Sequence, residues 1–235
     1  MSEASIVTVA EITKETPNFS AHLEEMTILL SLAFSKPLDP MTIPAVGVTY
    51  ENNPELHHEY SRAQLQAALT GAGRVFQAFI NINGLDRLAG IAVWYESGRQ
   101  FLDNDEQRTY WVPFLNRLDS ETRKWWREVM IHCYNQLTVE GLGEGTKKEI
   151  LHLQVLGVHP DFHRRGVGTA LVRHMLVQSD LQGIASCVET AKETNVLFYT
   201  SLGFEVKSER EIPSPHGDFA MLCLKREAGA KNLFN

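Results

Sequence analysis

Apolar residues in the first part of the chain recur at two different spacings. Alternation near residues 6–12 is typical of a half-buried strand. From Leu23 to Phe34 the apolar residues lie three or four positions apart, which predicts a helix that ends before Pro37. Several prolines interrupt residues 37–57, and we expect a loop there.

A second helix and a hairpin are predicted next. The helix covers residues 58–70 and ends at Gly71 and Gly73. Two apolar strands then flank Asn83 and Gly84, a pair that is typical of a tight hairpin turn. The first part of the chain therefore predicts a strand, two helices and a hairpin.

Residues 97–148 have polar turns at both ends and a predicted helix between them. Asp119 or Ser120 can cap this helix, and Gly141 is expected to end it. All four tryptophans lie in or just before this segment. Either they pack the segment onto the sheet, or they form an aromatic wall of a substrate site. They are Trp94, Trp111, Trp125 and Trp126.

The remainder of the chain alternates between strands and helices more regularly. We expect a strand, a helix, a strand, a short helix and a final hairpin, followed by a disordered tail. The ranges are 150–158, 167–178, 183–190, 194–203, 204–226 and, for the tail, 227–235.

Size, charge and cysteine content restrict the possible classes of protein. The 235 residues suit one domain with a full core, and the net charge of −7 disfavours a nucleic-acid partner. Cys133, Cys187 and Cys223 lie far apart among apolar neighbours, so we expect buried free thiols in a reducing compartment. The spacing of His, Cys and Asp residues predicts no metal site.

No segment of the sequence resembles a targeting or membrane segment. The N-terminal residues carry acids where a signal peptide is basic, and the longest apolar stretch is half the length of a membrane span. We therefore expect a cytoplasmic protein without a membrane partner, as a monomer or a homodimer.

Residues 157–172, "GVHPDFHRRGVGTALV", place two arginines and two glycines between a predicted strand and a predicted helix. Free N–H groups and the helix dipole bind phosphate at such a helix start, and glycine allows a close approach. The spacing differs from that of a P-loop and of a dinucleotide-binding fingerprint. By itself, the loop could also be an ordinary strand-to-helix turn with surface arginines.

This loop and a later stretch, "NVLFYTSLGFEV", together resemble the two signature motifs of the GNAT superfamily, the acetyl-CoA-dependent N-acetyltransferases. The resemblance covers residues 150–205. It implies the GNAT α/β fold over residues 1–226, a twisted, mixed, mostly antiparallel sheet with helices on both faces. The helical, aromatic segment 97–148 would then be an insert.

The resemblance also implies which residues bind acetyl-CoA and take part in acetyl transfer. The signature strand would bulge at Leu156, Gly157 and Val158, where backbone groups bind pantetheine and the Leu156 N–H faces the thioester carbonyl. Tyr199 matches the position that often protonates the departing thiolate, and a partly buried aromatic packing residue is the structural alternative. His163 departs from the usual first residue of the loop. The remaining implied cofactor contacts are His163, Arg164, Arg165, Gly166, Val167, Gly168, Thr169, Asn195 and Phe198.

An incoming amine is protonated, so a base is required within reach of it. Several family members carry this base on the signature strand, at the position of His152. Alternation would place His152 and Leu156 on the same face, toward the thioester. A histidine held by a backbone carbonyl is the structural alternative, and Glu189 and Glu96 are reserve bases.

The expected reaction is direct transfer of the acetyl group to a primary amine, with acetyl-CoA as cosubstrate. The stretch "AFSKPLDP" resembles members related to puromycin acetyltransferase, which favours a small-molecule amine. Two alternatives remain. One is an acceptor that is a protein N-terminus or lysine, and the other is a non-catalytic acyl-CoA-binding module.

Overall fold

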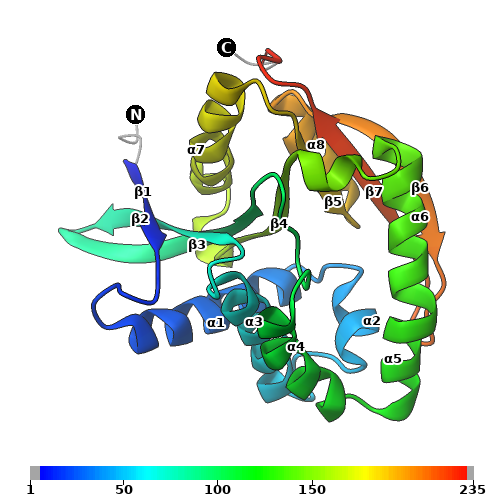
Figure 1. Ribbon diagram of the computed structural model, residues 1–235. Coiled ribbons are helices and arrows are strands. Elements are labelled where there is room, and N and C mark those ends of the chain that lie inside the picture. Colours follow the sequence, from blue (N-terminus) through cyan, green and yellow to red (C-terminus); the bar gives the residue numbers. More distant parts are fainter. Residues whose placement is uncertain (1–5, 232–235) are drawn as a thin grey trace.

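The computed structural model describes residues 6–231, which form helices around one seven-stranded sheet (Figure 1). The strand order is β1-β2-β3-β4-β5-β7-β6. All neighbours are antiparallel except β4 and β5, which are parallel. This is the mixed, mostly antiparallel sheet expected from the resemblance. In sheet order the strands are Val7–Ile12, Arg74–Ile82, Leu85–Tyr95, Leu151–Val158, Ser186–Thr190, Phe219–Arg226 and Glu205–Ile212.

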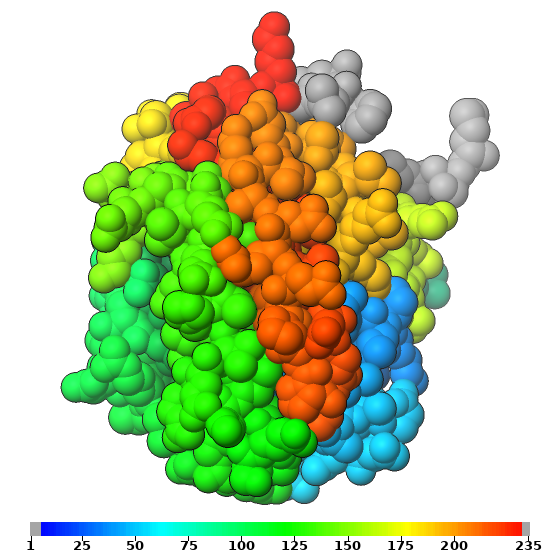
Figure 2. All heavy atoms as spheres, turned by 90° about the vertical axis from the view of Figure 1, so that its right-hand side faces the viewer, coloured from blue at the N-terminus to red at the C-terminus, as the bar shows by residue number. Residues whose placement is uncertain are grey.

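Helices cover both faces of this sheet, and Figure 1 shows α7 on the face opposite to α1 and α3. The last hairpin is covered by α6, which packs on β6 and β7. In Figure 2, α6 (green) lies beside this hairpin (orange). The helices α1 to α8 are Phe19–Ser35, Thr42–Val46, Pro54–Ala68, Asp105–Arg117, Ser120–Trp125, Ile131–Leu142, Val167–Gln182 and Glu193–Ser201. A π-helical turn, Trp126–Met130, joins α5 to α6.

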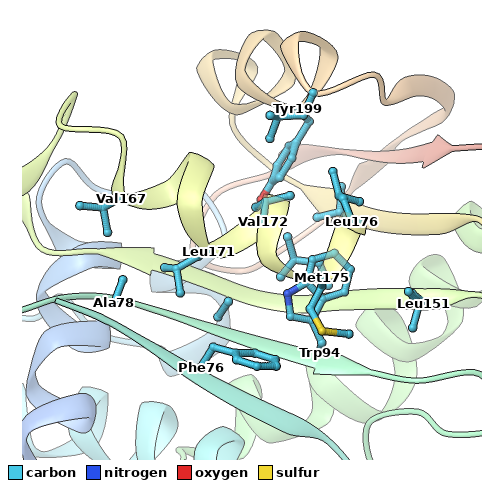
Figure 3. Packing of buried hydrophobic residues seen from close by; sticks show 14 of the residues in the cluster. Phe76, Ala78, Trp94, Leu151, Val167, Leu171, Val172, Met175, Leu176 and Tyr199 are labelled. Carbon is cyan, nitrogen blue, oxygen red and sulfur yellow. The ribbon is translucent and has the colours of Figure 1, made fainter. Parts of the chain in front are cut away.

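The main hydrophobic core lies between α7 and the strands. Leu171 and Met175 of α7 point toward Phe76 and Trp94, and all four side chains are fully buried (Figure 3). A second core on the opposite face packs α1 and α3 against β2, β3 and β4. The central strands are therefore fixed from both sides, and so is any site at their ends.

The parallel strands β4 and β5 are paired only at their starts. Leu151 to Leu153 face Ser186 to Val188, and the pairing ends there. Both strands continue beyond this point, so the edge of β4 is open toward β5. The register therefore leaves an opening between the two strands beyond Leu153 and Val188.

The bulge of β4 lies at Gln154, and not at Leu156 to Val158 as expected. Val93 pairs with Val155 and Trp94 with Leu153, which leaves Gln154 as the extra residue. A bulge reverses the alternation of side chains. Leu153 and Leu156 therefore both belong to the core on the α7 face, and the prediction that His152 and Leu156 share a face is wrong.

Two helical predictions are also wrong at their boundaries. Residues 37–57 contain α2, and α3 begins at Pro54, because proline is tolerated at the first position of a helix. Gly141 lies inside α6, which ends at Gly143 with a φ of 93°. Asp119 caps α5 as expected, accepting N–H bonds from Glu121 and Thr122.

The segment after Arg226 makes specific contacts in its first part. The Gly229 N–H donates to Asp180 over 2.7 Å, and Arg226 donates to the Ala230 carbonyl over 2.8 Å. The predicted disordered tail begins at residue 227, so its first part, residues 227–231, includes these contacts. Its last residues, 232–235, lie outside the described residues. Among residues 6–231, no helix combines the length and hydrophobicity that a membrane crossing needs.

Candidate active site

A cavity of about 590 Å³ opens beside the ends of β4 and β5. Its floor comes from the strands, and its walls come from α3, α4, the π-helical turn and α6. Four of the predicted site residues line it: His152, Leu156, Asn195 and Tyr199. The opening in the sheet and the cavity thus bring together residues that are up to 47 positions apart in the sequence.

Glu189 is the centre of a buried polar network at the cavity floor. Its carboxylate accepts hydrogen bonds from Lys147 over 2.9 Å and from the Tyr134 hydroxyl over 2.6 Å. The Nε2 atom of His152 lies 2.8 Å from the same carboxylate. Lys147 also contacts the Tyr134 hydroxyl directly. A single buried carboxylate therefore binds a lysine, a tyrosine and a histidine.

The protonation state of this network follows from its charges. Burial alone would raise the pKa of Glu189, but Lys147 and the hydrogen bonds from His152 and Tyr134 outweigh burial and lower that pKa strongly. Glu189 is thus a carboxylate that only accepts hydrogen bonds. Burial, assisted by the charge of Lys147, lowers the pKa of His152 below its usual 6.5.

His152 is therefore a neutral imidazole of defined tautomer at neutral pH. Its Nε2 must carry the proton that it donates to Glu189, because the carboxylate has none to give. Its Nδ1 has a free lone pair, is buried, and has no hydrogen-bond partner within residues 6–231. The structural alternative of a backbone-held histidine does not apply, since the partner of His152 is a carboxylate.

The nearby thiols belong to the same buried cluster. Ligand atoms of His152, Cys187 and Glu189 all lie within 4.8 Å of one another, a grouping that could hold a cation. However, the Lys147 ammonium already binds this carboxylate, and burial raises the pKa of the Cys187 thiol well above its usual value. A metal ion would have to displace Lys147 and deprotonate the thiol.

Tyr199 projects from α8 into the main core, and Figure 3 shows its hydroxyl directed toward Val172. Its ring packs against Phe198 and Phe204, with centroids 5.1 and 5.7 Å away. Its hydroxyl makes no hydrogen bond within the described part of the chain, and the residue lines the cavity. Burial raises the pKa of Tyr199, so this hydroxyl is protonated across the physiological range.

The start of α7 provides free N–H groups. Gly166 adopts a φ of 81°, which suits glycine, and the first helical hydrogen bond is donated by Ala170 to the Gly166 carbonyl. The preceding N–H groups of Val167, Gly168 and Thr169 receive no capping side chain from residues 6–231. The loop therefore has the geometry of an anion site at a helix N-terminus.

The charged side chains of the loop differ in their roles. Arg164 and Arg165 are exposed, and the Arg165 guanidinium lies 5.6 Å from the centroid of the Phe162 ring. His163 donates from Nε2 to the Val158 carbonyl over 3.0 Å, so its ring connects the loop to the end of β4. His163 thus has a structural contact within the protein that the sequence does not reveal.

Backbone groups of β4 face the opening beyond the bulge. The His159 N–H donates to Ala89 of β3 over 2.9 Å, and alternation then points the N–H groups of Leu156 and Val158 away from β3. Gly157 contributes differently: a Cβ atom there would lie 2.5 Å from Leu30, so this glycine allows α1 to pack closely. The predicted roles of Leu156 and Val158 are compatible with this arrangement.

The two other predicted contacts on α8 lie near the opening. Asn195 donates to Thr190 over 3.1 Å and so fixes the start of α8 to the end of β5. A Cβ atom on Gly168 would lie 3.4 Å from the Phe198 ring, so Phe198 packs against the Gly loop. Glu96, a reserve base in the sequence, is exposed and forms an ion pair with Arg74 instead.

Sequence reasoning missed the partners of the histidine. Tyr134 lies on α6 and Lys147 lies in the turn before β4, and no motif marks either residue. The only sequence signal is that Glu189 lies two positions after Cys187 in the same predicted strand. Alternation places both side chains on one face, and because we expect Cys187 to be buried, this is an unusual place for a carboxylate. All four tryptophans contribute to the hydrophobic cores, and Trp111 and Trp126 also line the cavity.

Comparison with known families agrees with this geometry. Residues 128–206, which include β4, the Gly loop, β5 and α8, match the family model of the acetyltransferase (GNAT) domain. This segment is similar to a GNAT acetyltransferase domain. The two motifs in the sequence and the opening between β4 and β5 lie within this segment.

Solved GNAT structures have the same fold over nearly the whole chain. A histone acetyltransferase HPA2 and related acetyltransferase of Corynebacterium glutamicum is 15% identical, with 96% of this chain and 98% of that chain covered and a TM-score of 0.61. The polyamine N-acetyltransferase of Drosophila melanogaster is 13% identical, covering 94% and 100%, with a TM-score of 0.59. Arylalkylamine N-acetyltransferase 2 of Aedes aegypti is 15% identical, covering 92% and 97%, with a TM-score of 0.56.

Proposed function

We propose that this GNAT protein transfers the acetyl group of acetyl-CoA directly to the primary amine of a small molecule. One observation carries this proposal. A neutral imidazole, held by a buried carboxylate, lines the cavity into which the edge of β4 opens. This arrangement supports a role for His152 as the base that acts on an amine beside a thioester bound along β4.

The Gly loop and the open strand edge would bind the cosubstrate. Free N–H groups at the start of α7 suit the pyrophosphate, and Arg164 and Arg165 add positive charge. The open edge of β4 beyond Gln154 offers backbone groups to the pantetheine amides. The Leu156 N–H would stabilise the negative charge that develops on the carbonyl oxygen during attack.

Three groups would then move the protons. His152 takes a proton from the incoming ammonium at Nδ1, and Glu189 stabilises the imidazolium that results. The freed amine forms a bond to the acetyl carbon, and the bond between that carbon and sulfur breaks. Tyr199 donates its proton to the departing thiolate, and the second proton that the amine nitrogen loses as it becomes an amide returns to the Tyr199 oxygen.

An activity screen and a binding measurement test this proposal together. The intact protein is incubated with acetyl-CoA and each member of a set of small amines, amino acids and peptides, and release of the free thiol is measured. We expect release that depends on the amine, and acetyl-CoA binding in calorimetry. Binding without release for any amine would support the non-catalytic alternative, and release with peptides alone would support a protein acceptor.

A further inference from the structure

The cavity has an aromatic wall that the transfer chemistry does not use. Trp111 of α4 lies at the centre of this wall. The ring centroids of Tyr60, Phe101 and Trp126 lie 5.9, 5.2 and 5.4 Å from its own. All four rings line the cavity, and they come from α3, the loop before α4, α4 and the π-helical turn. These four residues form the aromatic wall.

Two polar side chains beside this wall have unused hydrogen-bonding capacity. Gln64, one turn after Tyr60 on α3, is only 7% exposed and lines the cavity. Within residues 6–231, its side-chain amide has no hydrogen-bond partner. The amide atoms are not fully enclosed by the protein, so they reach the cavity, where a polar atom of a ligand can bind them.

Asp39 is the second of these side chains. Its carboxylate lines the cavity and accepts one backbone N–H, from Met41 over 3.0 Å. Burial raises the pKa of Asp39, although the Met41 N–H and the charge of Lys192 act in the opposite direction, so the carboxylate is only partly compensated within the protein. Burial is the main cause that raises the pKa of Tyr60 and of Tyr199, and the charge of Asp39 adds to it, so Asp39 acts on the aromatic wall and on the proposed thiolate donor.

The charges in the cavity restrict the number of cationic groups in the ligand. Glu189 is neutralised by Lys147 and cannot receive a further ammonium without losing that contact. Among the described residues that line the cavity, Asp39 is the remaining carboxylate. A second ammonium on the ligand would therefore be buried without a partner, which is unfavourable.

We propose that the acceptor is a primary monoamine with an aromatic or similarly flat apolar body. This inference rests on the proposed function. The body packs on the aromatic wall, Asp39 receives the ammonium, and the Gln64 amide receives a polar atom near it. Ring-on-ring contact and desolvation of the body provide the selectivity, while the single carboxylate selects against diamines.

Steady-state kinetics with 2-phenylethylamine, hexylamine and putrescine test the substrate class. We expect kcat/KM for 2-phenylethylamine to exceed that for putrescine by about tenfold or more, because the second ammonium has no partner. Trp126→Leu should reduce the preference for 2-phenylethylamine over hexylamine. Phe114→Leu is the matched control, because Phe114 packs on Trp111 and Tyr60 without lining the cavity.

Asp39→Asn tests the amine contact, because asparagine keeps the acceptor for the Met41 N–H and removes the charge. We expect the KM for 2-phenylethylamine to rise by about tenfold or more, with little change in the KM for acetyl-CoA. Asp105→Asn removes an exposed carboxylate elsewhere and should change neither value. An unchanged amine KM in the Asp39→Asn variant would overturn the contact.

The failures of the two proposals are distinguishable. A preference for putrescine or a peptide over 2-phenylethylamine would overturn this inference and leave the acetyl transfer standing. Absence of thiol release with every amine would overturn the proposed function. In that case, a titration of tryptophan fluorescence with 2-phenylethylamine in the presence of CoA decides the inference, since Trp111 and Trp126 should respond only if the amine binds on the aromatic wall.

Discussion

His152 and Glu189 lie on the neighbouring strands β4 and β5, with Nε2 of the imidazole 2.8 Å from the carboxylate. The two strands are paired at His152 and separate just beyond it, so the dyad lies at the point where the sheet opens. The carboxylate fixes the proton on Nε2 and leaves Nδ1 as the basic atom.

The first prediction is that His152→Gln lowers the rate without unfolding the protein. Glutamine can still donate to Glu189, but it has no basic nitrogen. We expect kcat/KM at neutral pH to fall by about a hundredfold to ten-thousandfold, and the loss to shrink at high pH, where the amine is already free. The measurement is a pH series for both proteins on one amine, with thermal unfolding as the control.

The same pH series locates the acidic limb. Burial lowers the pKa of His152 below its usual 6.5, so most of the imidazole is still neutral at pH 6.5. The rate of the parent protein should therefore decline only as the pH falls below that value. A variant that keeps the parent's acidic limb and most of its rate would show that His152 is structural.

Lys147→Met tests whether charge positions the base. Lys147 is the second cause, after burial, of the low pKa of His152. Removing the ammonium should raise that pKa, so that the acidic limb moves to higher pH. Lys148→Met removes the same charge from the next residue and should shift the limb less. An identical limb in the Lys147→Met variant and the parent would argue against this positioning role.

Tyr199→Phe tests the proton donor. The ring contacts with Phe198 and Phe204 are retained, and only the hydroxyl is removed. We expect turnover to fall by about a hundredfold while the calorimetric affinity for acetyl-CoA stays nearly the same. Equal losses of turnover and affinity would indicate that Tyr199 is a packing residue.

Gly168→Leu tests the close approach of a ligand to the start of α7. The larger side chain should crowd the pyrophosphate and raise the acetyl-CoA dissociation constant by about tenfold or more. Because Phe198 lies close to this position, Gly168→Ala serves as the matched variant: its Cβ atom meets Phe198 at an ordinary 3.4 Å. Unchanged affinity in a folded Gly168→Leu variant would contradict the proposed site.

Replacing Arg164 and Arg165 by alanine should have a smaller effect on acetyl-CoA binding. Both side chains are exposed, so salt screens their attraction for phosphate. We expect the loss of affinity to be largest at low ionic strength and to diminish as salt is added. Calorimetric titrations at two salt concentrations measure this, and a loss that is independent of salt would point to a change of loop conformation.

The sequence by itself determined most of the elements and the position of the Gly loop. Six of the strands lie within predicted hairpins or beside predicted motifs, so local spacing is enough to predict them. The free N–H groups of the Gly loop come from adjacent residues, so they need no long-range contact. His152 could be selected because it stands in the same short segment as the loop. The helix α4 could not be predicted, because Pro113 inside it argues against a helix.

Only the tertiary structure decided how the site works. The bulge at Gln154 changes the side of the sheet that each following residue faces, and it depends on the pairing of β4 with β3. Glu189, Tyr134 and Lys147 come from β5, α6 and the turn before β4, and no local pattern relates them. The state of His152 depends on burial and on these long-range charges, which form only when the chain is folded.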